Sequence, residues 1–315
     1  MDIAIQAESL TKIYPNQRGL PALRDLDLTI PAGILFGLVG PDGAGKTTAL
    51  RILSSVMLPT SGAVHVLGYD TRRQPDPIRQ KIGYMPQNFS LYPDLTVAEN
   101  LNFFADIQQV SPERKRSRIP EMLRFTRLQD FQTRRAAKLS GGMKKKLALA
   151  CALVHEPQIL ILDEPSTGVD PVSRRELWVI LSAVAEQGVT VLVSTPYMDE
   201  AERCHQVGVL YQGQMMAVGT PDELKQSLPF EILELKVSPR KRMRQIAAET
   251  PGVIEWRPVG DTLRLTTAIG SAQTVLRQLS RRLNQEDVQV HILRQTRSTM
   301  EDVFVHLVNI ERGRS

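Results

Sequence analysis

The segment that most limits the fold of this chain is a short apolar run followed at once by a glycine-rich stretch and a lysine. Residues 34–39 are apolar or glycine, and residues 40–47 read Gly-Pro-Asp-Gly-Ala-Gly-Lys-Thr, which satisfies the spacing G-x-x-x-x-G-K-[ST]. Between a strand and a helix, such glycines let backbone N–H groups converge on phosphate oxygens at the positive end of the helix dipole. We therefore predict an α/β fold with a phosphate-binding loop between a strand at 34–39 and a helix at 48–53.

This loop assigns roles to single residues. We expect Lys46 to reach the β- and γ-phosphates of a nucleotide and Thr47 to offer its hydroxyl to Mg²⁺. A glycine-rich turn that carries a lysine by chance is the alternative, and the expected strand and helix on either side argue against it. The expected nucleotide-binding residues of the segment are Gly40, Pro41, Asp42, Gly43, Ala44, Gly45, Lys46, Thr47 and Thr48.

A second apolar run, residues 158–162, ends in two acidic residues, Asp163 and Glu164. In α/β proteins, ligands bind where parallel strands end, so both carboxylates should lie near the phosphate loop. We expect Asp163 to hold the Mg²⁺ shell and Glu164 to polarise an attacking water as general base. The alternative is that the two acids only favour a helix N-terminus, and the loop upstream makes the catalytic interpretation the stronger one.

The pattern of apolar runs divides the chain into two parts. At about one domain per 150 residues, a chain of 315 residues predicts two domains, and the pattern changes after Leu228. Residues 1–228 alternate apolar runs with helical stretches, as in a mixed sheet covered by helices, and the alternating runs 3–5 and 26–30 predict two short strands near the start. A polar helical subdomain at about 90–140 interrupts this pattern. Residues 229–315 show the order β-α-β-β-α-β of a small, ferredoxin-like α+β domain. A closing helix follows, for which Ser298 and Glu301 are a candidate capping box.

Composition excludes several classes of protein. The charge sum, 39 − 34 = +5, is a mild basic excess that phosphate ligands, nucleic acid or an anionic surface would each explain. The apolar runs stay far below the ~20 residues of a transmembrane helix, and two cysteines cannot form a disulfide framework. We expect a cytoplasmic protein, and we interpret the basic runs 114–118 and 144–146 as solvated helix faces.

Further motifs resemble the ATP-binding subunits of ATP-binding cassette (ABC) transporters. Residues 139–143, Leu-Ser-Gly-Gly-Met, are similar to the family's LSGGQ signature, and residues 166–170 resemble its D-loop. Tyr14 matches the aromatic residue that stacks on adenine, and Gln87 matches the Q-loop residue that joins the Mg²⁺ site to the helical subdomain. Residues 197–202 and 300–304 look like the ABC-2 branch of multidrug exporter ATPases. The loop at 40–42 and the Tyr-Met-Pro-Gln segment resemble the first cassette of tandem exporter ATPases.

The resemblance implies the P-loop NTPase fold of an ABC cassette and an ATPase that uses ATP and Mg²⁺. It implies catalytic roles for Glu164, Lys46 and Gln87. It implies that Thr47, Gln87 and Asp163 ligate Mg²⁺. It also implies that Ser140, Gly141 and Gly142 contact ATP held by a partner chain.

The implied partners are integral-membrane permease subunits and a second cassette. The chain would then lie peripherally on the cytoplasmic face of the inner (plasma) membrane and energise export of a substrate that the permease selects. The alternative is a soluble cassette ATPase acting on nucleic acid or ribosomes. Since a zinc-finger pattern, a long coiled-coil insertion and a strongly basic tail are missing from the sequence, we expect no nucleic-acid partner.

Two residues depart from the family pattern. Met143 replaces the signature glutamine, and Pro196 stands where the family has a switch histidine that contacts the γ-phosphate. Proline has neither a side-chain donor nor a backbone N–H, and the loss of one transition-state contact typically slows a reaction by ~10²–10³. We therefore expect a slow site of its own and a heterodimer with a different cassette. A homodimer in which Glu164 alone suffices is the alternative.

Overall fold

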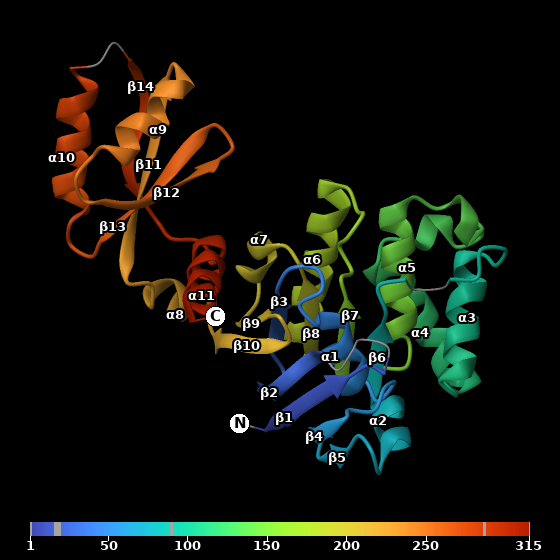
Figure 1. Cartoon of the computed structure of the whole chain (residues 1–315). Coiled ribbons are helices and arrows are strands. Elements are labelled where there is room, and N and C mark those ends of the chain that lie inside the picture. Colours follow the sequence, from blue (N-terminus) through green and yellow to red (C-terminus); the bar gives the residue numbers. More distant parts are fainter. Residues whose placement is uncertain (1, 16–19, 89–90, 286–287, 315) are drawn as a thin grey trace. The chain divides into compact units, whose positions relative to one another are not determined.

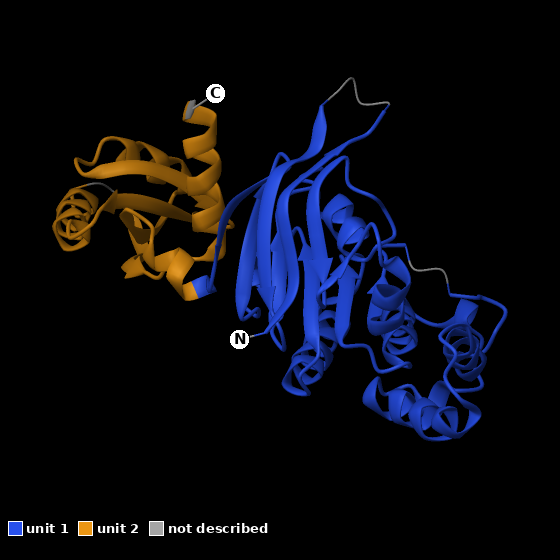
Figure 2. Ribbon diagram, turned by 90° about the horizontal axis from the view of Figure 1, so that it is seen from below, with its two compact units in different colours: residues 1–221 blue, residues 222–315 orange. Residues whose placement is uncertain are grey.

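The computed structural model describes residues 2–15, 20–88, 91–285 and 288–314. The chain forms two compact units, residues 1–221 and residues 222–315 (Figure 2). The change of sequence pattern after Leu228 comes later in the chain than this division, which falls within helix α8 (Pro221–Gln226). Among the described residues, no helix is both long enough and apolar enough to span a membrane.

The central sheet of unit 1 has the strand order β10-β9-β3-β8-β7-β6 (Figure 1) and is parallel from β9 to β6. Its middle strands are the continuous apolar runs of the sequence, which suit strands covered on both faces. Every residue is buried in β3 (Leu35–Val39), β7 (Ile159–Asp163) and β8 (Thr190–Thr195). The outer strands are β6 (Ile82–Met85), β9 (Gln206–Tyr211) and the antiparallel β10 (Gln214–Gly219).

A second, antiparallel sheet has the order β2-β1-β4-β5. Its strands are β1 (Ile3–Ile13), β2 (Pro21–Pro31), β4 (Ser61–Val66) and β5 (Tyr69–Asp70). The first two are longer than the runs 3–5 and 26–30 that the sequence predicted. Ser9 (φ 45°) and Asp25 (φ 42°) lie at register shifts between β1 and β2, and such bulges break the alternation on which the prediction depended.

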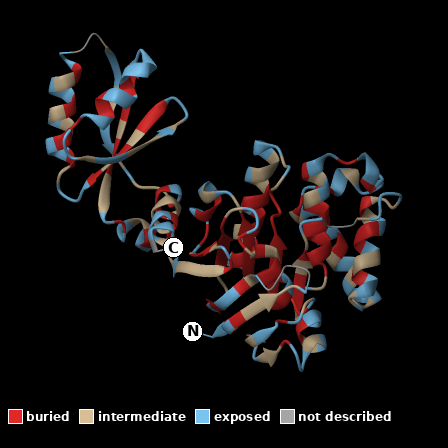
Figure 3. Ribbon diagram, in the orientation of Figure 1, coloured by how far each residue is buried: buried red, intermediate tan, exposed pale blue. Residues whose placement is uncertain are grey.

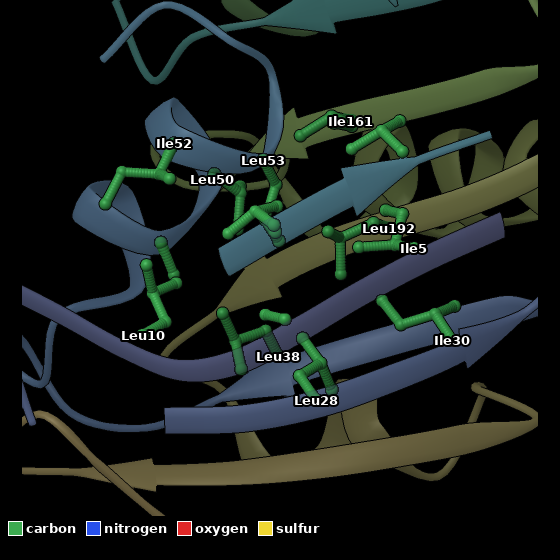
Figure 4. Close-up of a cluster of buried hydrophobic side chains, with 14 of the residues drawn as sticks. Ile5, Leu10, Leu28, Ile30, Leu38, Leu50, Ile52, Leu53, Ile161 and Leu192 are labelled. Atoms are coloured by element: carbon green, nitrogen blue, oxygen red, sulfur yellow. The ribbon is translucent and has the colours of Figure 1, made fainter. Parts of the chain in front are cut away.

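The hydrophobic core of unit 1 lies between the two sheets. Helix α1 (Lys46–Leu53) contacts strands of both and contributes Leu50, Ile52 and Leu53 to the cluster. The labelled side chains of Figure 4 include Ile5 and Leu10 from the antiparallel sheet. The helix that begins at the phosphate loop is thus held on both sides by strands, which places the loop rigidly.

The other helices of unit 1 cover the central sheet or form the helical insertion. They are α2 (Pro75–Lys81), α3 (Val97–Ile107), α4 (Pro112–Phe125), α5 (Gly141–Leu153), α6 (Pro171–Glu186) and α7 (Met198–Ala201). Helices α3 and α4 lie within the predicted subdomain at 90–140, and both contact α5, which begins at its end. Side-chain caps fix the starts of four of them: Thr96 and Glu99 form a capping box for α3, and Ser111, Ser140 and Asp170 cap α4, α5 and α6.

Buried residues gather in the central sheet, and the helices of unit 1 carry buried, intermediate and exposed residues (Figure 3). Within these helices, the two basic runs are less solvated than the sequence predicted. In α4, the side chains of Lys115 and Arg118 are only 16% and 15% exposed, and each pairs with a carboxylate. In α5, Lys146 is buried and pairs with Glu176 of α6. The prediction is wrong for these residues because a carboxylate accompanies each partly or fully buried cation: Lys115 and Lys146 meet acids of other helices, and Arg118 meets one a turn away in its own helix.

Unit 2 is an antiparallel sheet of order β12-β13-β11-β14. Its elements are β11 (Phe230–Ser238), α9 (Arg240–Ala248), β12 (Val253–Val259), β13 (Thr262–Ala268), α10 (Ala272–Leu283), β14 (Gln289–Thr296) and α11 (Met300–Arg314). Alternate residues of β11, among them Leu233 and Leu235, pack with α9 and α10 in one apolar cluster. This order confirms the predicted α+β domain with ferredoxin-like connections.

The start of α11 differs in detail from the prediction. Asp302 Oδ2 accepts the backbone N–H of Thr299 (2.8 Å) and its hydroxyl (2.9 Å), so the cap lies one residue later than the predicted pair of Ser298 and Glu301. Glu301 instead pairs with Arg257 of β12.

Candidate functional site

The phosphate loop lies where β3 ends and α1 begins, and two of its three glycines, Gly40 and Gly45, have no room for a side chain. A Cβ at Gly40 would stand 2.1 Å from the carbonyl oxygen of Leu210, and a Cβ at Gly45 would stand 2.6 Å from that of Ala22. Gly45 also has φ 107°, a backbone conformation that favours glycine. Close contact with Ala22 of β2 and Leu210 of β9 therefore restricts the loop to one backbone conformation, in which its N–H groups are available to a ligand.

Lys46, the first residue of α1, is fully enclosed and surrounded by oxygen atoms. Its Nζ donates to the carbonyl oxygens of Gly40 (2.8 Å) and Pro41 (3.1 Å) and lies 3.2 Å from Oε1 of Glu164. The two side chains of this ion pair are only 3% and 7% exposed. The structure thus joins the predicted loop lysine to the predicted general base, which comes from the end of β7 more than a hundred residues later.

Besides Lys46, three residues hold Glu164 in place. Its backbone N–H donates to Ser194 Oγ of β8 (3.0 Å), and its Oε2 accepts from Gln87 Nε2 (3.0 Å) and Thr167 Oγ1 (3.2 Å). The residue has φ 48°, which is uncommon for a residue with a side chain and persists only where the surroundings enforce it. The carboxylate is therefore fixed before any ligand arrives.

Asp163, the last residue of β7, is 1% exposed and meets Thr47 from α1. Its Oδ1 accepts from Thr47 Oγ1 (3.2 Å) and from Ser194 Oγ (2.7 Å), whereas Oδ2 is buried with no hydrogen-bond partner among the described residues. A buried carboxylate oxygen without a partner costs free energy unless a cation or donor meets it. These hard oxygen ligands fit Mg²⁺.

A cavity of about 340 Å³ collects most of the predicted residues. It is lined by Tyr14, Ala22, Asp42, Gly43, Gly45, Lys46, Thr47, Thr48, Gln87 and Glu164. Tyr14 is partly buried; its hydroxyl lies 3.2 Å from Thr48 Oγ1 and donates to Met57 Sδ. Two residues beside the cavity, Ser194 and Thr167, were missed by the sequence reasoning; the position of Ser194 near the end of an apolar run was a signal that could have found it.

The signature residues lie elsewhere. Ser140, Gly141 and Gly142 form the cap and first turn of α5, and none of them lines the cavity of Lys46. Gly142 is buried against α6, and a Cβ there would stand 2.4 Å from Ser173 Oγ. Helix α5, which is 13 residues long, therefore has a free N-terminal end outside the cavity of the chain's own phosphate loop.

Pro196 follows β8 in a turn that a buried glutamate organises. Glu200 is 1% exposed, and its Oε2 accepts from Thr195 Oγ1 (2.5 Å) and from Ser166 Oγ in the D-loop segment (3.0 Å). The backbone oxygen of Thr195 in turn accepts from Gly40 N of the phosphate loop (3.3 Å). The sequence reasoning missed Glu200, which ties the turn after β8 to the segment after Glu164.

Comparison with known proteins identifies the two units. A family model described as "ABC transporter" matches residues 23–167, and one described as "ATP-binding protein DrrA1-3-like, C-terminal domain" matches residues 219–308. The daunorubicin resistance ATP-binding protein DrrA2 of Streptomyces coeruleorubidus is 36% identical over 307 residues, which cover 96% of this chain and 94% of that protein. The chain belongs to the ABC transporter ATP-binding proteins of the DrrA type.

Two further relatives extend the comparison of this ABC protein. The probable multidrug ABC transporter ATP-binding protein YbhF of Escherichia coli (strain K12) is 44% identical over 267 residues, which cover 84% of this chain. The matched part is 46% of YbhF, so the chain spans about half the length of that relative. A dimeric ATP-binding cassette in a post-hydrolysis state, bound to ADP and Pi, is 29% identical with a TM-score of 0.63, over 69% of this chain and 98% of that one. The predicted ABC cassette fold with an added α+β domain is confirmed.

Proposed function

We propose that unit 1 binds ATP with Mg²⁺ in the cavity of Lys46 and hydrolyses it. The observation that supports this most is the bonding of Lys46, Glu164 and Gln87, from three separate segments, around one cavity. The N–H groups of residues 40–48 and the ammonium of Lys46 would hold the phosphates. The ring of Tyr14, at the side of the same cavity, would stack on adenine.

Thr47, Gln87 and Asp163 would hold Mg²⁺ beside the phosphates. Oδ2 of Asp163, which has no hydrogen-bond partner within the described residues, and the hydroxyl of Thr47 suit this role, since both are oxygen atoms and the two side chains are hydrogen-bonded to each other. When bound, the ion neutralises charge that develops on the phosphoryl oxygens. Ser194 keeps Oδ1 of Asp163 in place, so the carboxylate can present its other oxygen to the metal.

Glu164 would accept the proton of the attacking water and act as general base. Gln87 and Thr167 orient its Oε2, while Oε1 is paired with Lys46. Phosphate oxygens compete with Oε1 for the lysine, so nucleotide binding would free one carboxylate oxygen for the water. The same competition ties activation of the base to occupancy of the site.

We further infer that Ser140, Gly141 and Gly142 contact ATP bound by a second cassette. They sit at a helix N-terminus outside their own chain's cavity, where the positive end of a helix dipole would be of use to a phosphate brought by a partner. Two cassettes would then enclose two ATP molecules, and hydrolysis would remove the γ-phosphate that links them. The likeness to a dimeric cassette supports this arrangement.

Pro196 would make the chain's own site slow. It offers no donor at the place of the family's switch histidine, and loss of one such contact typically costs ~10²–10³ in rate. A different cassette would then supply a competent site, so we favour a heterodimer over a homodimer.

The cassettes would energise export through integral-membrane permease chains, with this chain on the cytoplasmic face of the membrane. The names of its relatives, a daunorubicin resistance protein and a probable multidrug transporter component, suggest drugs as the exported class. The permease chains would provide the contacts that select among them.

The first test is phosphate release by the purified full chain with Mg–ATP, alone and with its permease and partner cassette. Glu164→Gln should lower the rate by about 10²–10⁴-fold, while Glu186→Gln, at an exposed glutamate at the end of α6, should leave it unchanged. Turnover that survives Glu164→Gln contradicts the assigned base. Fast turnover of the chain alone that Glu164→Gln abolishes contradicts only the slow site. Salt-sensitive retention on nucleic acid, without recovery in membranes that hold the permease, contradicts the exporter.

A further inference from the structure

Lys145 lies in the first turns of α5, five residues after the cap Ser140, and differs from the lysines on either side of it. Lys144 is exposed, and its side chain makes no hydrogen bond or ion pair within the described part of the chain, whereas Lys146 pairs with Glu176. Lys145 is half-buried, and its Nζ donates to the backbone oxygen of Gln87 (3.1 Å). A cation is thus directed inward, to the backbone of the Q-loop.

The surroundings of Lys145 belong to the phosphate site. Burial lowers the pKa of its ammonium, and the carboxylates of Asp163 and Glu164 act in the opposite direction, so both are close enough to act on its charge. Lys145 also lines a cavity of about 530 Å³ between the Q-loop and α5 together with Gln87, Thr167 and its neighbour Lys144, so the hydrogen bond to Gln87 is what distinguishes Lys145 from Lys144. Lys145 therefore contacts the same residue, Gln87, whose side chain donates to Glu164.

A continuous set of polar contacts joins the phosphate loop to α5. Lys46 Nζ pairs with Glu164 Oε1 (3.2 Å), Glu164 Oε2 accepts from Gln87 Nε2 (3.0 Å), and Gln87 O accepts from Lys145 Nζ (3.1 Å). Lys145 is part of the same helix whose cap is Ser140. Every step of this path lies within one chain, and each of its residues is within unit 1.

We propose that Lys145 is a positioning residue that links nucleotide at the chain's own phosphate loop to the placement of its signature helix α5. This deepens the proposed function and depends on it, because α5 would serve the ATP of the partner cassette. A phosphate bound by Lys46 would break the ion pair between Lys46 and Glu164. The Glu164 carboxylate, which accepts the hydrogen bond from the Gln87 side chain, can then shift. Movement of Gln87 then reaches α5 through its backbone oxygen and Lys145, and a rigid helix transmits it to Ser140, Gly141 and Gly142.

A purely structural role predicts something different. If Lys145 only fastened the Q-loop to α5, its loss would loosen both segments equally with and without nucleotide. If it couples them, its loss removes the response of α5 to ATP and leaves the binding of ATP unchanged. The difference between the ATP-bound and ATP-free states, and not stability itself, separates the two.

The test is hydrogen–deuterium exchange of the full chain with and without Mg–ATP, at a concentration where mass photometry shows monomers. Peptides covering 139–147 report on the start of α5, and peptides covering 40–50 report on the phosphate loop. In the unmodified chain, ATP should change exchange at 139–147 by at least about fivefold, the lower end of typical couplings. Lys145→Met should abolish that change, Lys145→Arg should restore it, and Lys144→Met, the matched control, should keep it.

Exchange at 40–50 should slow equally in all four proteins, which shows that each binds ATP. The proposal is overturned if Lys145→Met keeps the response at 139–147, or if the unmodified chain protects 40–50 but shows no response there; in both cases the proposed ATP site stands. Absence of ATP protection at 40–50 in the unmodified chain overturns the proposed function together with this inference.

Discussion

Gly142, in the first turn of α5, has no space for a side chain, and replacing it by alanine should destabilise unit 1. The added Cβ would stand 2.4 Å from Ser173 Oγ and 2.5 Å from Ser173 Cβ. A serine can rotate its hydroxyl away but cannot move its Cβ without its backbone. The start of α5 or of α6 must therefore shift.

The magnitude follows from overpacking of a buried contact, which costs about 1–3 kcal/mol. Alanine is intrinsically better than glycine within a helix by up to about 1 kcal/mol, so this gain partly offsets the clash. Gly141→Ala isolates the gain, because the nearest atom to a Cβ at Gly141 is the Gly168 oxygen at 3.7 Å, an ordinary contact. The difference between the two variants should be about 1–3 kcal/mol, the cost of the clash.

Removing the opposing side chain should rescue the variant. Ser173→Gly deletes both close atoms, and the next nearest atom, Asp170 Oδ2, would lie at an ordinary 3.6 Å. Alone, this substitution should cost about 0.5 kcal/mol through lower helix propensity. Together with Gly142→Ala it should be less damaging than the sum of the two, with a coupling of at least about 1 kcal/mol.

Urea unfolding of the unmodified chain, the three single variants and the double variant, followed by circular dichroism, measures these free energies. The reasoning is refuted if Gly142→Ala is as stable as Gly141→Ala, or if Ser173→Gly gives no rescue. ATP hydrolysis by the same set adds a functional result. If the double variant regains activity, residue 142 must be glycine because it packs against α6. If it stays inactive although it is stable, residue 142 must be glycine because a phosphate approaches it closely.

Two further predictions concern the pH dependence of stability and the second unit. Burial lowers the pKa of His155 below 6.5, although its hydrogen bond to the Ile82 oxygen acts in the opposite direction. Below pH 6.5 the unfolded chain therefore takes up a proton that the folded chain does not, so the free energy of unfolding should fall with pH, and fall less in His155→Gln. Equal pH dependence of the two proteins in urea unfolding from pH 7.5 to 5 would contradict this. Asp302 is 4% exposed and accepts from Arg257 (2.6 Å) and Arg264 (2.7 Å). Asp302→Asn should therefore destabilise unit 2 by about 3 kcal/mol, the lower end for a broken buried ion pair, and leave ATP binding by unit 1 unchanged. A free energy of unfolding equal to that of the unmodified chain would show that solvent already screens the charges of these arginines.

Much of the fold could be predicted because its signals are local. The buried strands at 35–39 and 159–163 are continuous apolar runs within one residue of the predicted limits, and the β-α-β-β-α-β order of unit 2 follows from alternating periods along the chain. The first two strands were predicted too short, because the bulges at Ser9 and Asp25 reverse the side of the sheet on which apolar residues stand.

Lysine burial was the less predictable part. The run 144–146 reads as three equal cations, yet one is exposed, one is directed to the Q-loop and one is buried against Glu176. Successive helix positions are about 100° apart, so neighbours in the run face different surroundings, and only packing decides which of them meets a carboxylate.

What the sequence by itself determined is the phosphate loop and the helix that follows it, since eight adjacent residues create the whole cradle of N–H groups. Only the tertiary structure decided how that loop is completed. It pairs Glu164 with Lys46 and gives the carboxylate hydrogen bonds from Gln87 and Thr167. It also joins the backbone of Gln87 to the signature helix through Lys145. The physical reason is that a cradle of backbone groups needs only neighbours in the chain, whereas buried charges are stabilised by partners from strands and helices far apart in sequence that end at the same edge of a sheet.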